Sequence, residues 1–117
     1  MRVKVSEVDG IHASTPQAGQ RLYAIIEPAI ARGEVVTLDF EGVKHFGPGF
    51  FNWSIGVLIE QDMENRLTGL LRYENLPPLG QNSLESVVEY ATRRRENPQW
   101  AAAMEAVVRK RAEKADE

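Results

Sequence analysis

The chain has 117 residues, of which 43% are hydrophobic and 26% are charged, a composition typical of one folded globular domain. It contains no cysteine, which excludes a disulfide framework, a thiolate metal site and a cysteine nucleophile. The formal net charge of −3 gives no overall electrostatic reason to bind nucleic acid. Residues 1–8 lack the apolar run of a signal peptide, and no segment approaches the roughly 18 apolar residues that span a bilayer. We therefore expect a cytoplasmic protein that does not contact membranes.

The first two predicted elements are a strand and a helix. Residues 2–8 should form the strand, because apolar residues such as Val3 and Val5 alternate with polar ones. The helix should begin at Thr15 and Pro16, since threonine can cap a helix and proline is tolerated in its first turn.

This helix should carry one buried stripe and a bend. The stripe has the i, i+3, i+4, i+7, i+8 spacing of an amphipathic helix and contains Leu22, Ile25, Ile26, Ala29 and Ile30. Pro28 lies inside the helix and should bend it, because its ring opposes the carbonyl group four residues earlier. Gly33 should end the helix, because glycine favours the left-handed geometry found there.

The middle of the chain predicts a strand, a helix and another strand. Residues 35–40 are continuous, apolar and rich in β-branched side chains, which is typical of a central strand covered on both faces. After a loop over residues 41–49, residues 50–59 should form a helix that is buried around much of its circumference. Gly56 is unfavourable in a helix by roughly 1 kcal/mol relative to alanine, so it indicates close packing. A third strand is expected within residues 67–75.

Two further helices are expected after this strand. Asn82 and Glu85 form a capping-box pattern, which predicts that one helix begins at Asn82. Asn97 and Pro98 should restart the chain as the last helix. The inner stripe of that last helix would contain Trp100, Ala103, Met104 and Val107.

The element order β-α-β-α-β-α-α predicts the fold class, a small α/β domain with a central parallel or mixed sheet and helices packed on it. No repeat or linker divides the sequence, so residues 1–117 are expected to form a single domain. Residues 1–96 would be its core, and residues 97–117 a C-terminal helix with a frayed end.

The segment of residues 39–51, which joins the central strand to the next helix, is the first candidate site. Ligands and partners of open α/β sheets tend to meet the loops at the carboxyl ends of the strands. The backbone N–H groups at the start of the following helix would be free to receive an anion or an acceptor of a partner.

A short motif marks this segment: an apolar strand ending in Asp39-Phe40, then Gly42-Val43, Phe46 and Gly47-Pro48-x-Phe50. The motif resembles the STAS-like domain family of unknown function, which is related to the STAS domains of bacterial anti-sigma-factor antagonists. The resemblance is best over residues 19–76, extends toward residue 96 and leaves out the last helix.

The resemblance implies a non-catalytic regulatory module whose loop and helix dock a protein partner, often an ATP-binding kinase-like protein. In the related antagonists a serine at the start of this helix is phosphorylated, and the added charge breaks the interface. Gly49 occupies that position here and has no hydroxyl. Ser54 lies further along, but its apolar neighbours favour a packed hydroxyl. The residues expected to contact the partner are Asp39, His45, Gly47, Pro48, Gly49, Phe50 and Asn52.

A purely structural interpretation of this segment is also open, as is a second function. Gly47 and Gly49 would also permit a tight turn into a helix packed close to the sheet. His12 and His45 lie in predicted loops without a candidate nucleophile or metal-ligand spacing, so we expect no enzyme activity, no metal and no cofactor. The alternative is a small phosphate- or nucleotide-binding protein or enzyme that uses His45, Asp39 and the helix N-terminus near Gly49.

Two interactions outside this segment are also left open. Residues 1–92 carry 7 basic and 12 acidic groups, whereas residues 93–117 carry 7 basic and 5 acidic groups. The basic clusters at residues 93–95 and 109–111 would serve a DNA-associated function, but the interleaved acids favour a solvated helix face. The last helix would pack on its own core or on a second copy, forming a homodimer.

Overall fold

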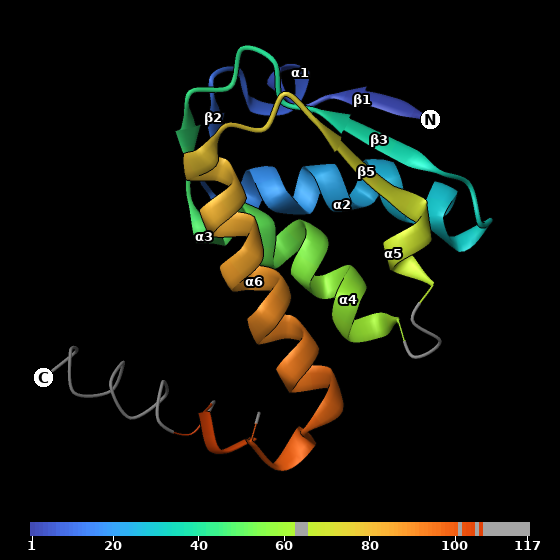
Figure 1. Ribbon diagram of the computed structural model, residues 1–117, viewed down its shortest axis with the longest axis vertical. Coiled ribbons are helices and arrows are strands. Elements are labelled where there is room, and N and C mark those ends of the chain that lie inside the picture. The colour runs from blue at the N-terminus through green and yellow to red at the C-terminus, as the bar shows by residue number, and fades with distance from the viewer. Residues whose placement is uncertain (63–65, 101, 105, 107–117) are drawn as a thin grey trace, which may run out of the picture.

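The computed structural model describes residues 1–62, 66–100, 102–104 and 106 (Figure 1). The strands are β1 (Arg2–Lys4), β2 (His12–Ala13), β3 (Val36–Asp39), β4 (His45–Phe46) and β5 (Leu71–Glu74). The helices are α1 (Ser6–Asp9), α2 (Pro16–Ala31), α3 (Pro48–Phe51), α4 (Val57–Gln61), α5 (Leu67–Leu70) and α6 (Pro78–Glu96). A π-helical segment, η1 (Asn52–Gly56), joins α3 to α4 without a break.

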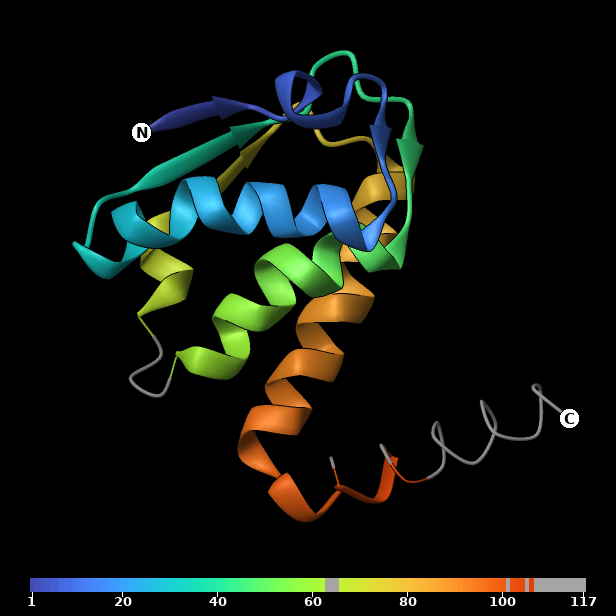
Figure 2. The same ribbon diagram turned by 180° about the vertical axis from the view of Figure 1, so that it is seen from behind.

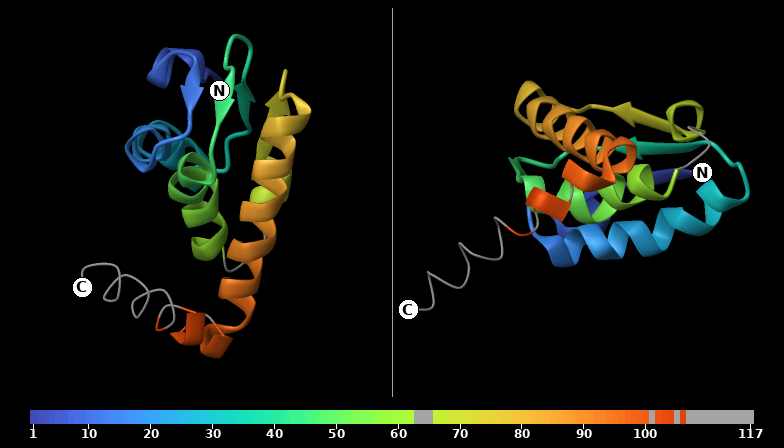
Figure 3. Two further views of the ribbon diagram at one scale, coloured as in Figure 1. Left: turned by 90° about the vertical axis from the view of Figure 1, so that its left-hand side faces the viewer. Right: turned by 90° about the horizontal axis from the view of Figure 1, so that it is seen from below.

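The main sheet has the order β1-β3-β5 and is parallel throughout, so the α/β prediction is confirmed. Val3, Leu38 and Tyr73 stand side by side across its three strands. Figure 1 and both views of Figure 3 place α2, α4 and α6 on one side of this sheet. Figure 2 shows α2 running alongside the helix that α3, η1 and α4 form together.

The two faces of β3 differ, which corrects the prediction that this strand is covered on both faces. Val36 and Leu38 are fully buried beneath the helices. Thr37 and Asp39 alternate with them and therefore point to the other face. The neighbouring positions on that face carry the polar residues Arg2, Lys4, Arg72 and Glu74. The run of β-branched residues concealed this alternation, because threonine fits either face.

The first predicted strand is shorter than expected, because the chain turns into α1 at Ser6. The predicted loop over residues 41–49 contains β4, which pairs in parallel with β2. The amides of Lys44 and His45 both donate to the carbonyl oxygen of Ile11, at 2.8 and 3.0 Å. Strands of two residues carry no alternating pattern, so these two were missed.

The boundaries of α2 are those predicted. Thr15 Oγ1 accepts a hydrogen bond from the amide of Ala18 at 3.1 Å, Pro28 lies inside the helix, and Gly33 has a φ of 78° just after its end. The predicted stripe was too wide, because Ile25 is 43% exposed.

The helix of α3, η1 and α4 is held between α2 and α6 by two glycines. A Cβ on Gly19 of α2 would collide with the carbonyl oxygen of Phe50. A Cβ on Gly56 would lie 3.3 Å from Val87 Cγ1 of α6, which confirms the close packing predicted there. The helix thereby buries Phe50 and Phe51 completely.

The start of α6 differs from the prediction, because Pro77 and Pro78 begin the helix four residues before Asn82. Pro77 is extended at the capping position and Pro78 occupies the first turn, where a proline is tolerated. A Cβ on Gly80 would lie 2.9 Å from Cε1 of Phe46, so this first turn also packs against β4.

The helical restart at Asn97 is confirmed, because its Oδ1 accepts a hydrogen bond from the amide of Trp100 at 3.0 Å. Residues 98–100, 102–104 and 106 are helical. The ring of Trp100 packs on α6, with its centroid 5.4 Å from that of Tyr90 and 5.1 Å from the guanidinium carbon of Arg93. Val107 and the second basic cluster lie outside the described residues.

Asp39, at the carboxyl end of β3, is bonded to the first residue of β1 and to Asn75, which directly follows β5. Its Oδ1 accepts hydrogen bonds from Asn75 Nδ2 at 2.8 Å and from the amide of Glu41 at 3.0 Å, and its Oδ2 lies 3.0 Å from Arg2 Nη2. Arg2 also pairs with Glu74 at 2.5 Å. The bonds from Asn75 and Glu41, together with the charge of Arg2, lower the pKa of Asp39 below its ordinary value of 3.8.

Gly19→Ala should destabilise the fold by about 1–3 kcal/mol, because the new methyl group meets a backbone carbonyl that cannot turn away. Urea unfolding measures the effect. Gly69→Ala is the matched control, since a Cβ there meets nothing within 4 Å and should be neutral or slightly stabilising. Equal stability of the two variants would contradict the tight contact.

Asp39→Asn should be less stable than the wild type at neutral pH, and the difference should shrink as the pH falls. A lowered pKa in the folded state means that the carboxylate stabilises the fold above the ordinary value of 3.8 and loses this effect as the pH falls through the lower folded-state pKa. Unfolding by urea at a series of pH values measures the difference. If the difference in stability between the wild type and Asp39→Asn stayed constant down to the lowest pH, the charge of Asp39 would not contribute to that difference.

Candidate functional site

The segment of residues 39–51 leaves the carboxyl end of β3, turns at Gly42 with a φ of 85°, passes through β4 and enters α3 at Pro48. The amide of Gly47 donates to the carbonyl oxygen of Ala13 at 3.0 Å. The segment is therefore fastened along its length to β2 and the residues beside it, and it presents a defined backbone rather than a free loop.

The structure separates the seven predicted contact residues by exposure. Asp39 and Phe50 are buried, at 3% and 0% exposure, Asp39 on the polar face of the sheet and Phe50 beneath the sheet. Asp39 holds the strand ends in place, and Phe50 is part of the core. His45, Pro48 and Asn52 are exposed, and Gly47 and Gly49 are half-buried. The exposed members come from β4, from the start of α3 and from the start of η1.

The two glycines pack against the segment that precedes α2. A Cβ on Gly47 would lie 3.0 Å from the carbonyl oxygen of Ser14. A Cβ on Gly49 would lie 3.1 Å from Cδ of Pro16 and 3.2 Å from the same oxygen of Ser14. The structural interpretation of these glycines is therefore supported, and a side chain at Gly49 would press on the domain itself.

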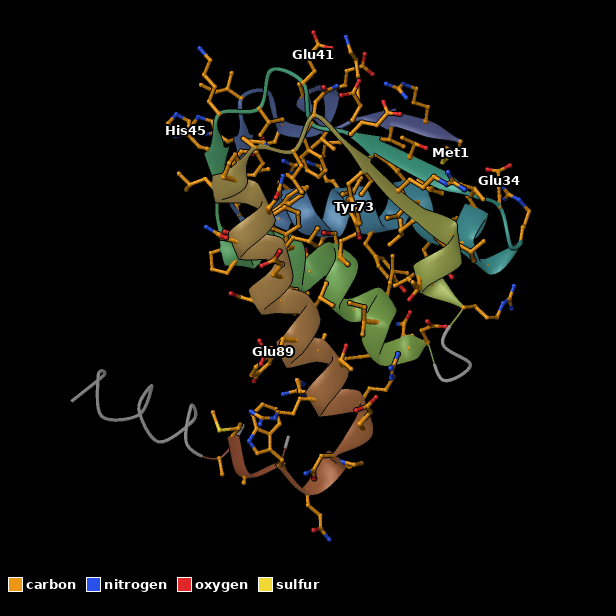
Figure 4. All side chains as sticks on the ribbon, in the orientation of Figure 1. Met1, Glu34, Glu41, His45, Tyr73 and Glu89 are labelled. Atoms are coloured by element: carbon orange, nitrogen blue, oxygen red, sulfur yellow. The ribbon has the colours of Figure 1, made fainter. Side chains whose placement is uncertain are left out.

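His45 lies at the outer side of β4 (Figure 4) and stacks on His12 of β2. The two ring centroids are 4.8 Å apart, with 20° between the ring planes. The pair follows from the parallel register, which places the two histidines opposite each other. Within the described residues no group of three or more His, Cys, Asp or Glu side chains is arranged to hold a metal ion.

Trp53 is exposed, although it lies within residues 50–59, for which the sequence predicts a helix buried around much of its circumference. It is 47% exposed, and its Cβ would be 3.0 Å from a Cβ on Gly19 of α2. A helical projection starting at Pro48 could have found it, because the buried residues of this helix follow one stripe and Trp53 falls outside it. That stripe consists of Phe50, Phe51, Ser54, Ile55 and Leu58.

We define the β4–α3 surface as the exposed residues His45, Pro48, Asn52 and Trp53. Pro48 and Asn52 are four residues apart and therefore project from the same side of the helix. Trp53 adds the only large apolar side chain of this set.

Ser54 is completely buried, as its neighbours predicted. Its Oγ donates a hydrogen bond to the carbonyl oxygen of Phe50 at 2.7 Å. A kinase cannot reach this hydroxyl in the folded domain.

Clefts lie between α2, α4 and α5, between β5 and α6, and at the end of α6, and none of the seven predicted residues lines them. The basic cluster of residues 93–95 contacts the protein itself: Arg93 lies over Trp100, Arg94 pairs with Glu60, and Arg95 donates to the carbonyl oxygen of Asp62. In the part of the chain that the structure describes, no helix is long and apolar enough to cross a membrane.

Comparison with known families adds one finding to this geometry. The model of the STAS-like domain of unknown function (DUF4325) matches residues 18–81, from the first turn of α2 to the first turn of α6. The matched range contains β3, β4, α3 and the whole β4–α3 surface. No curated protein and no solved structure matches the chain. The match covers more than half of the 117 residues, and the chain belongs to the family of STAS-like domains of unknown function.

Proposed function

We propose that this chain is a non-catalytic regulatory module that docks a protein partner through its β4–α3 surface. The observation that carries the proposal is the exposed Trp53, which stands beside Asn52 on a helix fixed between α2 and α6. The proposed partner is an ATP-binding kinase-like protein, as the family resemblance implies, and we propose the cytoplasm as the location of both.

Large exposed aromatic side chains are frequent anchors of protein interfaces, because they bury much area with few rotatable bonds. Trp53 has this character, and Asn52 next to it offers both a hydrogen-bond donor and an acceptor. The backbone beneath them is already ordered by the packing of Gly19 and by the hydrogen bond from Gly47 to Ala13. A partner would therefore lose little free energy in ordering this surface.

The proposed docking is not controlled by phosphorylation at the start of the helix. Gly49 has no hydroxyl. The nearest serine of the helix, Ser54, is buried, and its hydroxyl donates a hydrogen bond to the carbonyl oxygen of Phe50. Control in this proposal belongs to the partner, through its own nucleotide state or abundance.

Trp53→Ala should weaken partner binding by about 30-fold, the effect of losing roughly 2 kcal/mol at an interface anchor. The partner is first captured from cell extract with the wild-type chain and identified, and the affinity of the purified partner is then measured by calorimetry. Ile25→Ala is the matched control, since Ile25 is 43% exposed on α2 and lies outside the β4–α3 surface.

Both variants should unfold at temperatures close to each other, because the two side chains are exposed to a similar extent, 47% and 43%. These variants are preferable to a substitution at Gly49, where a side chain would press on Pro16. The docking proposal fails if Trp53→Ala and Asn52→Lys bind the captured partner as tightly as the wild type does.

Nucleotides and phosphorylated metabolites should not raise the melting temperature of the chain by itself. A ligand that binds only the folded state stabilises it in proportion to the logarithm of its concentration over Kd. Thermal-shift measurements against a panel of such compounds test this expectation. A concentration-dependent rise that His45→Ala abolishes would instead establish the alternative function of ligand binding near α3.

A further inference from the structure

The outer edge of β5 is the feature that neither the family nor the proposed function explains. Within the described residues β5 pairs only with β3, and the right-hand view of Figure 3 shows it at the margin of the molecule. Arg72, Tyr73 and Glu74 are all exposed. An exposed edge strand offers unpaired N–H and C=O groups to another chain, and proteins normally cover or blunt such edges.

The direction of the free backbone groups follows from one hydrogen bond. The carbonyl oxygen of Glu74 accepts from the amide of Phe40 at 2.9 Å, so the backbone groups of Glu74 point toward β3. Backbone groups alternate in direction along a strand. The N–H and C=O of Tyr73 therefore point toward the open edge.

We propose that β5 pairs with β5 of a second copy of this chain, antiparallel and with Tyr73 opposite Tyr73 of that copy. The two tyrosines then exchange two N–H···O=C hydrogen bonds, as directly opposed residues with outward backbone groups do in an antiparallel ladder. The two three-stranded sheets become one continuous sheet of six strands.

The charges of the strand select the second copy as the occupant. With Tyr73 on the two-fold axis, Arg72 of each copy stands opposite Glu74 of the other, and opposed unlike charges stabilise a strand pair. In the two neighbouring registers the two-fold axis passes through Arg72 or through Glu74. The first register places the two Arg72 side chains opposite each other, and the second does the same with the two Glu74 side chains, so both oppose like charges. Of these three registers, only the one centred on Tyr73 places unlike charges opposite each other.

The ion pairs of the single chain leave these charges available. Arg72 makes no ion pair with any described residue. Glu74 is bound to Arg2 on the polar face of the sheet and is still 47% exposed at its side chain. A carboxylate accepts several hydrogen bonds, so Glu74 can hold Arg2 and face Arg72 of the second copy together.

The inner side of the same edge offers apolar area for the contact. Figure 4 places Tyr73 beneath β5, on the side of the helices. There it lines a groove between β5 and α6 together with Leu71, Ile55, Ile59 and Val88. Tyr73 and Val88 are 36% and 37% exposed, and the tyrosine of the second copy would cover this part of the groove.

Sedimentation equilibrium tests the pairing with two charge reversals. The wild type should sediment at twice the chain mass of 13.1 kDa, whereas Arg72→Glu and Glu74→Arg should each sediment as monomers because like charges then face each other. An equal mixture of these two variants should again give dimers, since one copy carries two glutamates and the other two arginines at the opposed positions. Restoration by mixing cannot arise from misfolding of either variant.

Lys44→Glu is the matched control for Arg72→Glu, because it also replaces a positive by a negative charge, on an exposed residue outside β5. It should remain dimeric. A monomeric wild type, single variants that stay dimeric, or a mixture that stays monomeric would each overturn the proposal. Trp53→Ala should not alter the dimer, so this result and the docking result are independent.

Discussion

The contact between Gly19 of α2 and the carbonyl oxygen of Phe50 is the constraint on which the rest of the structure depends. Only a residue without a Cβ allows the two helices to approach this closely. The approach pushes Phe50 and Phe51 into the core and turns Asn52 and Trp53 outward. Gly56 likewise permits a close approach on another side of the helix, where it packs against α6. The surface proposed for docking is thus the outer side of a helix whose position is set by its inner side.

The same packing explains why a phosphoserine switch has no place at the start of α3. Ser14 and Pro16 close the space that a Cβ on Gly49 would enter, so the position lacks room as well as a hydroxyl. The glycine at this position is part of the packing between α3 and the N-terminus of α2. Asn52 and Trp53, one turn further along, are exposed and offer the proposed docking surface without a hydroxyl group.

Much of the fold could be predicted, because single residues with strong conformational preferences mark the boundaries of α2 and the position of Gly56. Thr15 and Gly33 each behave as their local chemistry requires. The strands β2 and β4 could not be predicted, since two residues carry no period and their pairing depends on a chain segment some thirty residues away. The start of α6 lies before the capping pattern at Asn82, because Pro77 and Pro78 also fit the start of a helix. Within the candidate site, exposure depends on which side of the helix packs inward, and sequence composition alone does not reveal that.

The β4–α3 surface and the β5 edge share no residue, and this separation has a consequence for regulation. A dimer joined through β5 carries two β4–α3 surfaces, one on each copy. When a dimeric partner has bound the first site, the second site is held close to it, and its effective concentration is high. Modest affinity at each site then gives strong overall binding. Such a module loses its partner when the dimer separates, even though no residue of the docking surface changes. Self-association would then act together with the nucleotide state or abundance of the partner, in place of the phosphorylated serine of the related antagonists.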